Sequence, residues 1–498
     1  MDLFHNLLFG FSVALSLQNL LYCFIGALVG TLIGVLPGIG PMATIAMLMP
    51  LTFNVPPVAA LIMLAGIFYG AQYGGSTTSI LVNLPGETSS VVTCIDGYQM
   101  ARQGRAGPAL AIAAIGSFFA GTVCTLLIAM FGPPIAELAL RFNSPEYFSL
   151  MLMGLVAAAV LAHGDTSKSL AMMVLGLLLG SVGTDVDSGM ERFSFGIYEL
   201  ADGIGFVVVA IGVFAVGEII SNLSDPEERM VFTSKVKNLF PTKEDLRQSL
   251  APILRGTVLG AFFGVLPGTG PAIASFSSYM VEKKVAKNPE RFGHGAIEGV
   301  AGPESANNAD AQCKFIPMLT LGIPASGAMA LMLGALMIHG IAPGPTVMTQ
   351  RPDLFWGLIA SMWVGNLMLV VLNLPLVGLW VSLLKIPYRL LFPAIMAFSA
   401  IGIYSSNNAA FDVYLTALFG ILGVIWRRLG CNPVPLMLGF VLGPMLEENL
   451  RRAMLISRGD PTVFITRPIS LGFIIATVLI LMAMAAPVLR KRWEAITG

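Results

Sequence analysis

Apolar segments close to the length of a bilayer crossing recur along the whole chain of 498 residues. A transmembrane helix needs about 20 consecutive, mainly apolar residues. Charged residues are too few for a soluble surface, since only 11% of the chain is Asp, Glu, Lys or Arg, against about 25% in soluble domains. The sequence therefore predicts an all-α polytopic membrane protein with about 10 to 12 spanning or half-spanning segments. The apolar windows are residues 20–36, 107–131, 147–162, 168–182, 203–221, 251–266, 354–381, 390–403, 412–426, 433–446 and 469–487.

Charge and reactive side chains argue against several other classes of protein. The 28 basic and 28 acidic residues balance, so nothing indicates a nucleic-acid partner. Cysteines and histidines are scattered, and we predict neither a disulfide framework nor a metal site. The chain has no Ser/His/Asp order and no Walker sequence, so we expect neither an enzyme nor an ATPase, and no cofactor.

A glycine- and proline-rich motif occurs twice. Gly30-Thr-Leu-Ile-Gly-Val-Leu-Pro-Gly-Ile-Gly-Pro41 recurs 230 positions later as Gly260-Ala-Phe-Phe-Gly-Val-Leu-Pro-Gly-Thr-Gly-Pro271, with eight of twelve residues identical. A period this long indicates two duplicated helix bundles and not a solenoid.

The charges of matched loops predict that the two halves are inverted repeats. The turn at 54–57 is uncharged, whereas its counterpart at 283–291 is basic. The next connection reverses this pattern, with Arg102 and Arg105 in the first half and an uncharged stretch at 341–345 in the second. Cytoplasmic loops carry an excess of Lys and Arg, so reversed charge at matched positions indicates reversed orientation.

A polar, basic stretch separates the two halves. We predict a first transmembrane repeat at residues 1–220, a cytoplasmic linker at 221–250, a second repeat at 251–450, and a C-terminal segment with the last transmembrane helix at 451–498. The same rule places the N-terminus outside the cell and the C-terminus inside, and it leaves the topology of 446–468 open.

The Pro-Gly-x-Gly-Pro core of the motif breaks a helix inside the membrane. Proline removes a backbone donor, glycine lets the chain turn, and the second proline suits the first position of a new helix. We expect new helices at 41–53 and 271–281, whose free amide groups and positive dipole ends form an anion site. The predicted substrate contacts here are Pro37, Gly38, Ile39, Gly40, Pro41, Pro267, Gly268, Thr269, Gly270 and Pro271.

Two other interpretations of the motif remain open. Glycines at such a position also serve close packing between membrane helices. Residues 38–43 formally match the GxGxx[GA] pattern of dinucleotide-binding folds, but that fingerprint requires a preceding strand in a soluble βαβ unit. The occurrence of the motif in both halves favours the binding interpretation.

Each half also contains a polar stretch after its broken helix, at 69–79 and at 302–310. Hydroxyl and carbonyl oxygens in such stretches bind small cations or the oxygen atoms of a substrate. We predict further substrate contacts from Ser76, Thr77, Asn83, Asn307, Asn308, Lys314 and Ser326, and a cation site formed by Thr78, Asp310 and Thr320.

Asp310 and Lys314 are four residues apart, so on a helix they share a face and can pair. One placement puts them in water at the cytoplasmic end of the helix, where an ion pair contributes little. The other puts Lys314 at membrane depth, where its ammonium needs a counter-ion and a substrate carboxylate would provide one.

Several further motifs occur in a fixed order along nearly the whole chain. With the two glycine-proline motifs they are Tyr73-Gly-Gly-Ser76, Leu84-Pro-Gly86, Asp96-Gly-Tyr98, Gly104-Arg-Ala106, Pro303-Glu-Ser-Ala-Asn-Asn308, Leu319-Thr-Leu-Gly-Ile-Pro324 and Gly443-Pro-Met-Leu-Glu-Glu-Asn449. In this set and order the chain resembles the large membrane subunit of the tripartite tricarboxylate transporters. Asp310 and Lys314 depart from the resemblance, because small neutral residues are usual at these positions in that family.

The resemblance implies a permease of the bacterial inner membrane that takes up a tricarboxylate, a dicarboxylate or an aromatic acid by alternating access. It also implies two partners, a small membrane subunit of about four helices and a periplasmic solute-binding protein. Na⁺ or H⁺ is the expected coupling ion, because accumulating an anion against an inside-negative potential needs a cation gradient. A channel-like passive facilitator of organic anions and an intramembrane enzyme are the alternatives from other classes.

Overall fold

The computed structural model describes residues 3–36, 40–162, 164–185, 188–217, 219–220, 239–383, 393, 396–397, 399–404 and 408–497. Helices make up most of this part of the chain, and the strands β1 (Gly183–Thr184) and β2 (Glu191–Arg192) form one small antiparallel hairpin. The predicted all-α polytopic fold is confirmed. The helices in the described ranges that are long and apolar enough to cross a membrane are α2 (Leu17–Val35), α4 (Pro57–Val82), α6 (Ala106–Ala139), α7 (Ser144–Leu161), α17 (Pro352–Asn373) and α20 (Ala410–Arg428).

The other elements are shorter, less apolar or interrupted. In the first part of the chain they are α1 (Leu3–Ala14), α3 (Pro41–Thr52), η1 (Thr88–Ser90), α5 (Val91–Arg102), α8 (Thr166–Gly180), η2 (Tyr198–Leu200), α9 (Phe206–Ala210) and η3 (Ile211–Val216). In the second part they are α11 (Lys243–Val265), α12 (Pro271–Val285), η4 (Pro289–Arg291), α13 (Glu298–Cys313), α14 (Phe315–Leu321), α15 (Gly327–Ile338), α16 (Thr346–Gln350), α18 (Val377–Leu383), α21 (Val434–Ile456), α22 (Val463–Thr466) and α23 (Pro468–Thr497).

Two helices cross boundaries that the sequence predicted. Helix α11 begins at Lys243, inside the expected linker, because Thr242 and Asp245 cap its first turn reciprocally with bonds of 3.0 and 3.1 Å. Helix α21 continues to Ile456, past the expected end of the second repeat. Residues 221–238 of the linker and most of the window 390–403 lie outside the described residues.

The same close helix pair occurs in both halves, α2 against α4 and α11 against α13. Gly26, Gly30 and Gly34 of α2 lie on one face, four residues apart, and a Cβ placed on Gly34 would be 2.3 Å from the Ala71 carbonyl oxygen. Gly256, Gly260 and Gly264 repeat this arrangement on α11, and a Cβ on Gly260 would be 2.1 Å from the Ala306 carbonyl oxygen. Small residues at this spacing let membrane helices approach to backbone contact. The two glycine triplets are 230 positions apart, as the motif is.

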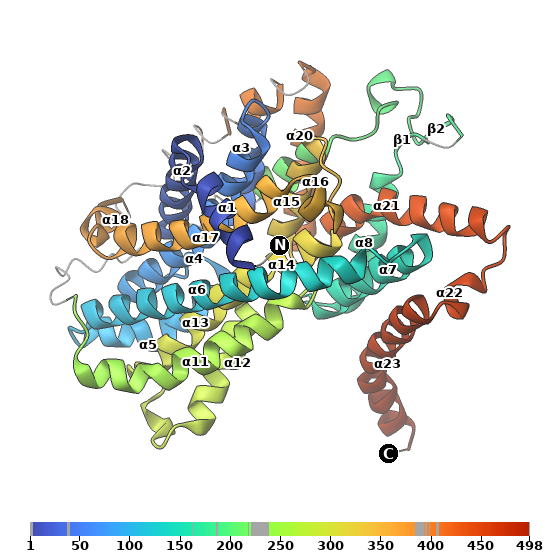
Figure 1. Cartoon of the computed structure of the whole chain (residues 1–498). Coiled ribbons are helices and arrows are strands. Elements are labelled where there is room, and N and C mark those ends of the chain that lie inside the picture. Colours follow the sequence, from blue (N-terminus) through green and yellow to red (C-terminus); the bar gives the residue numbers. More distant parts are fainter. Residues whose placement is uncertain are drawn as a thin grey trace.

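Helices of one half pack on the other half. Helix α6 lies along α13, and α17 lies along α4, as Figure 1 shows near the centre of the molecule. The hairpin and the helices α7, α8, α21 and α23 form a group to one side (Figure 1). The inverted orientation of the halves and the domain boundaries stay predictions.

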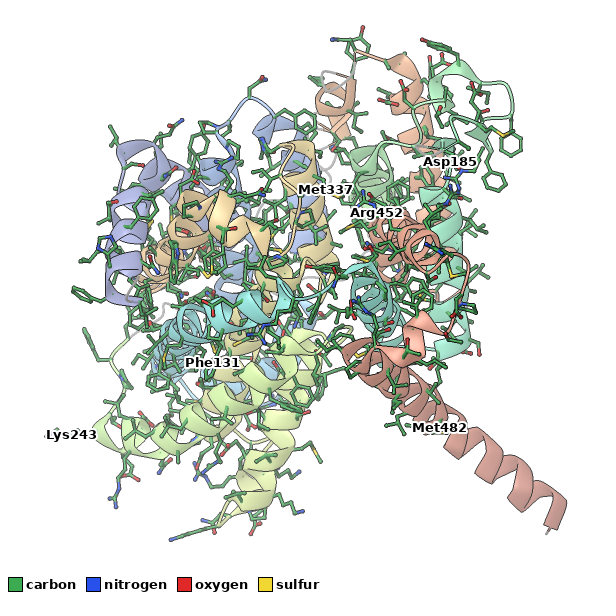
Figure 2. All side chains as sticks on the ribbon, turned by 45° about the vertical axis from the view of Figure 1, so that its right-hand side comes forward. Phe131, Asp185, Lys243, Met337, Arg452 and Met482 are labelled. Carbon is green, nitrogen blue, oxygen red and sulfur yellow. The ribbon has the colours of Figure 1, made fainter. Side chains whose placement is uncertain are left out.

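The outer surface carries many apolar side chains. Phe131 on α6 and Met482 on α23 are 52% and 54% exposed, and Figure 2 shows both on the outside of the ribbon. A soluble protein rarely exposes so many large apolar groups, whereas a surface in contact with lipid is expected to do so. Charged groups such as Arg451 and Asp185 pair where α21 meets the hairpin, at 3.0 Å.

Candidate functional site

The first helix break leads into a partly open cavity of about 540 Å³. Residues 37–39 lie outside the described residues, but Gly40 caps α3 with extended backbone and Pro41 is its first residue, as predicted. The volume falls within the range of about 300 to 1,000 Å³ that is usual for small-molecule sites. The lining residues are Gly40, Pro41, Met42, Pro85, Gly86, Glu87, Thr88, Val91, Phe214, Arg427, Gly430, Cys431, Asn432, Pro433 and Val434.

The cavity has the features of a site for an anion. The N-terminal amide groups of α3 and the positive end of its dipole are at the wall that Gly40 and Pro41 form. Arg427, from the last turn of α20, adds a guanidinium group, and Glu87 adds a carboxylate. Arginine suits carboxylate ligands because its planar fork can donate two parallel hydrogen bonds. Sequence reasoning missed Arg427, which is far from the motif along the chain.

Each half has two helix breaks. The first is the glycine-proline motif, and the second is at 83–87 in the first half and at 322–326 in the second half. In each half the two breaks lie against each other. A Cβ on Gly86, after α4, would be only 2.0 Å from the Gly34 carbonyl oxygen, near the end of α2. In the second half, the Gly268 amide donates to the Ala325 carbonyl at 3.0 Å. The two breaks of each half therefore form one compact unit.

The helix starts of the two halves also approach one another. Helix α3 packs on α15 of the other half, and a Cβ on Gly327 at the start of α15 would be 2.7 Å from the Met42 sulfur. Likewise α12 packs on η1, which follows the second break of the first half. Ser326, a predicted substrate contact, caps α15 by accepting from the Met329 amide at 3.4 Å.

The predicted residues of the glycine-proline motif in the second half do not line this cavity. Gly268 has a φ of +82° and packs on α7, where a Cβ would be 2.4 Å from the Ala158 Cα. The Thr269 hydroxyl lies 2.5 Å from the carbonyl oxygen of Phe263, which ties the break to the end of α11. Pro267, Gly270 and Pro271 complete the turn, with Pro271 in the first position of α12 as predicted. Their substrate contacts stay predictions.

A buried carboxylate joins the two polar stretches. Glu304 on α13 has no exposed surface, and the Ser76 hydroxyl of α4 donates to its Oε2 at 2.5 Å. The Thr93 hydroxyl of α5 donates to Oε1, and Asn307 donates to Oε2 at 3.4 Å. Asn308 donates at 2.7 Å to Ser117 of α6. Sequence reasoning selected Ser76, Asn307 and Asn308 but missed Glu304 and Thr93; the signal was an acid within a polar motif between apolar spans.

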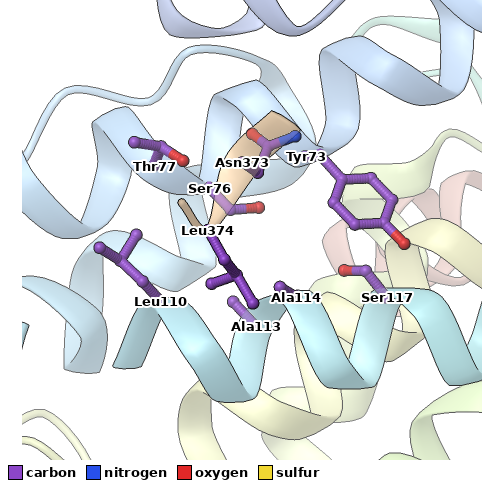
Figure 3. Close-up of a pocket in the computed structure, with 9 residues that line it drawn as sticks. All are labelled: Tyr73, Ser76, Thr77, Leu110, Ala113, Ala114, Ser117, Asn373 and Leu374. Carbon is purple, nitrogen blue, oxygen red and sulfur yellow. The ribbon is translucent and has the colours of Figure 1, made fainter. Parts of the chain in front are cut away.

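A second, small cavity lies beside this carboxylate, with room for about one water molecule. Figure 3 shows Tyr73, Ser76 and Thr77 of α4 around this cavity, with the Tyr73 hydroxyl near Ser117 of α6 and Ser76 near Asn373 of α17. Within the described residues, the Tyr73 hydroxyl and the Asn373 Oδ1 are buried and have no hydrogen-bond partner. Buried polar groups usually bond to protein or to water, so this wall is suited to hold a water molecule.

Asp310 and Lys314 form the ion pair that their spacing predicted, and both side chains are completely buried. The placement in water is therefore wrong, because α6 and α11 cover α13 here. The Lys314 ammonium donates to Asp310 Oδ2, while Oδ1 of Asp310 has no partner among the described residues. The charge of Lys314 is thus balanced inside the protein, and its contact with substrate stays a prediction.

Three other predicted residues use their polar groups locally. Thr78 donates to the Val35 carbonyl at 2.8 Å, and Thr320 donates to the Ile316 carbonyl at 2.7 Å. Asn83 is exposed and ends α4 in the left-handed conformation, with a φ of 58°. These contacts connect or end helices; cation binding by Thr78 and Thr320 and substrate binding by Asn83 stay predictions. The histidine, cysteine and acidic side chains of the described residues form no metal-binding cluster.

The fold and the site define a class of protein, a multi-pass helical membrane protein in which broken helices from two halves meet beside a cavity. This is an architecture of membrane transport proteins. The family model described as "Tripartite tricarboxylate transporter TctA family" matches residues 20–438. The chain belongs to this family and is a large membrane subunit of the tripartite system.

Two relatives come from Agrobacterium vitis. One, named "Uncharacterized 52.8 kDa protein in TAR-I ttuC' 3'region", is 60% identical over 492 residues, which are 99% of this chain and 98% of the relative. The other, "Uncharacterized protein in TAR-II ttuC' 3'region", is 62% identical over 234 residues, which are 47% of this chain and 97% of the relative. No solved structure matches the chain.

Proposed function

We propose that this subunit carries an organic carboxylate across the bacterial inner membrane by cation-coupled alternating access. The observation that supports the proposal is the cavity that Arg427 and the N-terminus of α3 share. A carboxylate there gains amide donors, a favourable dipole and a guanidinium partner in a setting of low dielectric constant.

The family implies the rest of the system. A periplasmic binding protein would deliver the carboxylate, and a small membrane subunit would complete the permease. The N-terminus then lies in the periplasm and the C-terminus in the cytoplasm. Uptake of an anion works against the inside-negative membrane potential, so symport with H⁺ or Na⁺ supplies the energy. Tricarboxylates, dicarboxylates and aromatic acids share the carboxylate that the site recognises.

The test is uptake into proteoliposomes that contain this chain, the small subunit and the binding protein. Labelled citrate, succinate and benzoate are offered separately, with an imposed H⁺ or Na⁺ gradient. We expect accumulation of at least one of them above the external concentration. Equilibration without accumulation would instead indicate a channel-like facilitator.

Arg427→Gln tests the site itself. Loss of a charge-assisted bond to the carboxylate should lower uptake at limiting substrate by about tenfold or more. Arg428→Gln is the matched control, because Arg428 is the next residue on α20, is exposed and does not line the cavity. Equal uptake by the two variants would contradict the proposed carboxylate site.

A further inference from the structure

We propose that Glu304 is the residue that binds and releases the coupling proton of transport. This inference rests on the proposed cation-coupled function and assigns its coupling ion and site. Glu304 belongs to α13 in the second half, whereas its close donors Ser76 and Thr93 belong to α4 and α5 in the first half. A charge at this position therefore acts on the contact between the two halves.

The carboxylate of Glu304 lacks a neighbouring positive charge. Among the described residues it forms no ion pair, whereas Asp310 on the same helix pairs with Lys314, and Glu282 of α12 pairs with Arg255 of α11. Neutral donors alone hold it, and an isolated buried carboxylate is costly unless a cation neutralises it. A proton that binds as the substrate binds removes this cost.

The surroundings leave Glu304 as the group that changes charge. Tyr73 of α4 and Cys94 of α5 are close enough to interact with it electrostatically, and both are neutral near pH 7. The charged groups nearest to it on the packed helices are already paired. They are Glu282 of α12 with Arg255 of α11, Asp96 of α5 with backbone amides, and Asp310 with Lys314 further along α13. Two other titratable groups lie on neighbouring segments. Glu87 of the adjoining break lines the larger cavity, and Cys124 of α6 lies beside Cys313.

The geometry favours a proton over a metal cation. Ser76 Oγ and Glu304 Oε2 are 2.5 Å apart, the length of a charge-assisted O–H···O⁻ bond. Oxygens that share a cation of about the size of Ca²⁺ lie about 2.3 to 2.6 Å from the metal and therefore stand farther from each other. Ser76 and Thr93 thus donate directly to the carboxylate, as hydroxyls that stabilise its charged form do.

The small cavity provides the route. It is lined by Ser76, the donor to Glu304, and by the unpartnered Tyr73 hydroxyl and Asn373 Oδ1. A water molecule there can pass a proton to Glu304 when the cavity connects to one side of the membrane. The proton adds to a carboxylate oxygen, crosses with the substrate, and leaves to water on the other side, so each cycle moves one proton together with the negative charge of the substrate.

The experiment compares wild type and Glu304→Gln in the complete complex, reconstituted in proteoliposomes with labelled citrate, succinate and benzoate as probes. Glutamine copies the protonated side chain and cannot release a proton. With one proton per substrate, a pH gradient of about one unit drives about tenfold accumulation in wild type, and Glu304→Gln should give none. Exchange of external label against internal unlabelled substrate, which needs no net proton movement, should continue in Glu304→Gln at close to the wild-type rate.

Glu298→Gln is the matched control, because Glu298 begins the same helix and pairs with Arg291 near the surface. It should accumulate substrate as wild type does. Accumulation by Glu304→Gln in a pH gradient, or a folded Glu304→Gln that no longer exchanges, would overturn the inference. So would a wild type that responds to Na⁺ alone, although the proposed function would then still stand. A wild type that moves none of the three probes would refute both.

Thr93→Val keeps the carboxylate and covers the case in which Glu304→Gln does not fold. Loss of one hydroxyl that stabilises the charged carboxylate should move the pH profile of accumulation upward by about one unit. An unchanged profile would contradict proton binding at Glu304.

Discussion

Lys314→Met should destabilise the folded subunit far more than a surface substitution does. The ammonium of Lys314 and the carboxylate of Asp310 are both without exposed surface, and Asp310 Oδ1 already has no donor among the described residues. Removing Lys314 leaves the Asp310 charge buried and unpaired. Breaking such a pair on one side costs about 3 to 5 kcal/mol.

The double variant Asp310→Asn, Lys314→Met separates the charge from the packing. It contains no buried charge, so its free energy of unfolding should return to within about 1 kcal/mol of wild type, since neutral replacements of buried pairs are often tolerated. Glu448 and Arg452 on α21 provide the matched control, because they have the same spacing and are 52% and 64% exposed. Arg452→Met should change the free energy of unfolding by no more than about 0.5 kcal/mol.

The free energies would be measured by titrating the purified subunit in mixed micelles with dodecyl sulfate and following helix content by circular dichroism. The prediction is a coupling energy between positions 310 and 314 of about 3 kcal/mol, and close to zero between 448 and 452. If Lys314→Met costs no more than Arg452→Met, water reaches Asp310 or the carboxyl is already neutral, and the argument from burial is wrong.

Two further substitutions test how the breaks and loops are held. Gly268→Ala should lower the free energy of unfolding by about 1 to 2 kcal/mol because of the left-handed backbone alone, and by more because of the close approach to the Ala158 backbone. The same titration measures this loss. Gly472→Ala is the control and should not destabilise the subunit, because Gly472 is on α23 with open space around it. Asp96→Asn should speed amide hydrogen exchange at Gly293, Gly295 and Ala296 by about tenfold or more, because all three amides donate to Asp96 Oδ1 at 2.8 to 2.9 Å. Asp353→Asn is the control. It disrupts an ion pair with Arg351 at 2.9 Å and should leave the exchange of those three amides unchanged.

Local signals predicted where the broken helices restart. Proline in the first position after Gly40 and Gly270 fixes the start of α3 and α12, and both begin where the sequence indicated. The predicted end of the second new helix at 281 was wrong, because α12 continues to Val285. Its last turn contains Lys283 and Lys284, which the charge pattern assigned to a basic loop at 283–291. Lysines suit this position in a helix because they lie at the negative end of its dipole.

The candidate sites were harder to predict, because they depend on which helices meet. Gly40 and Pro41 could be selected from the motif, but Arg427 joins them only through the packing of the chain around the cavity. Glu304 lies within a quoted motif, yet nothing in its neighbours shows that hydroxyls from α4 and α5 enclose it. The burial of Asp310 and Lys314 likewise follows from coverage by α6 and α11 and not from the polarity of 302–314 itself.

The two cavities are connected through a very short part of the chain. Glu87 lines the larger cavity, and a Cβ on Gly75 of α4 would be 3.4 Å from the Glu87 backbone nitrogen. The residue after Gly75 is Ser76, which donates to Glu304, and Thr93, six residues after Glu87, donates to the same carboxylate. Both hydroxyls that hold Glu304 therefore belong to segments in contact with the wall of the substrate cavity. A substrate that moves this wall when its carboxylate binds must also move the hydroxyls of Ser76 and Thr93. The preference of Glu304 for the charged or the protonated form then changes with the positions of these donors.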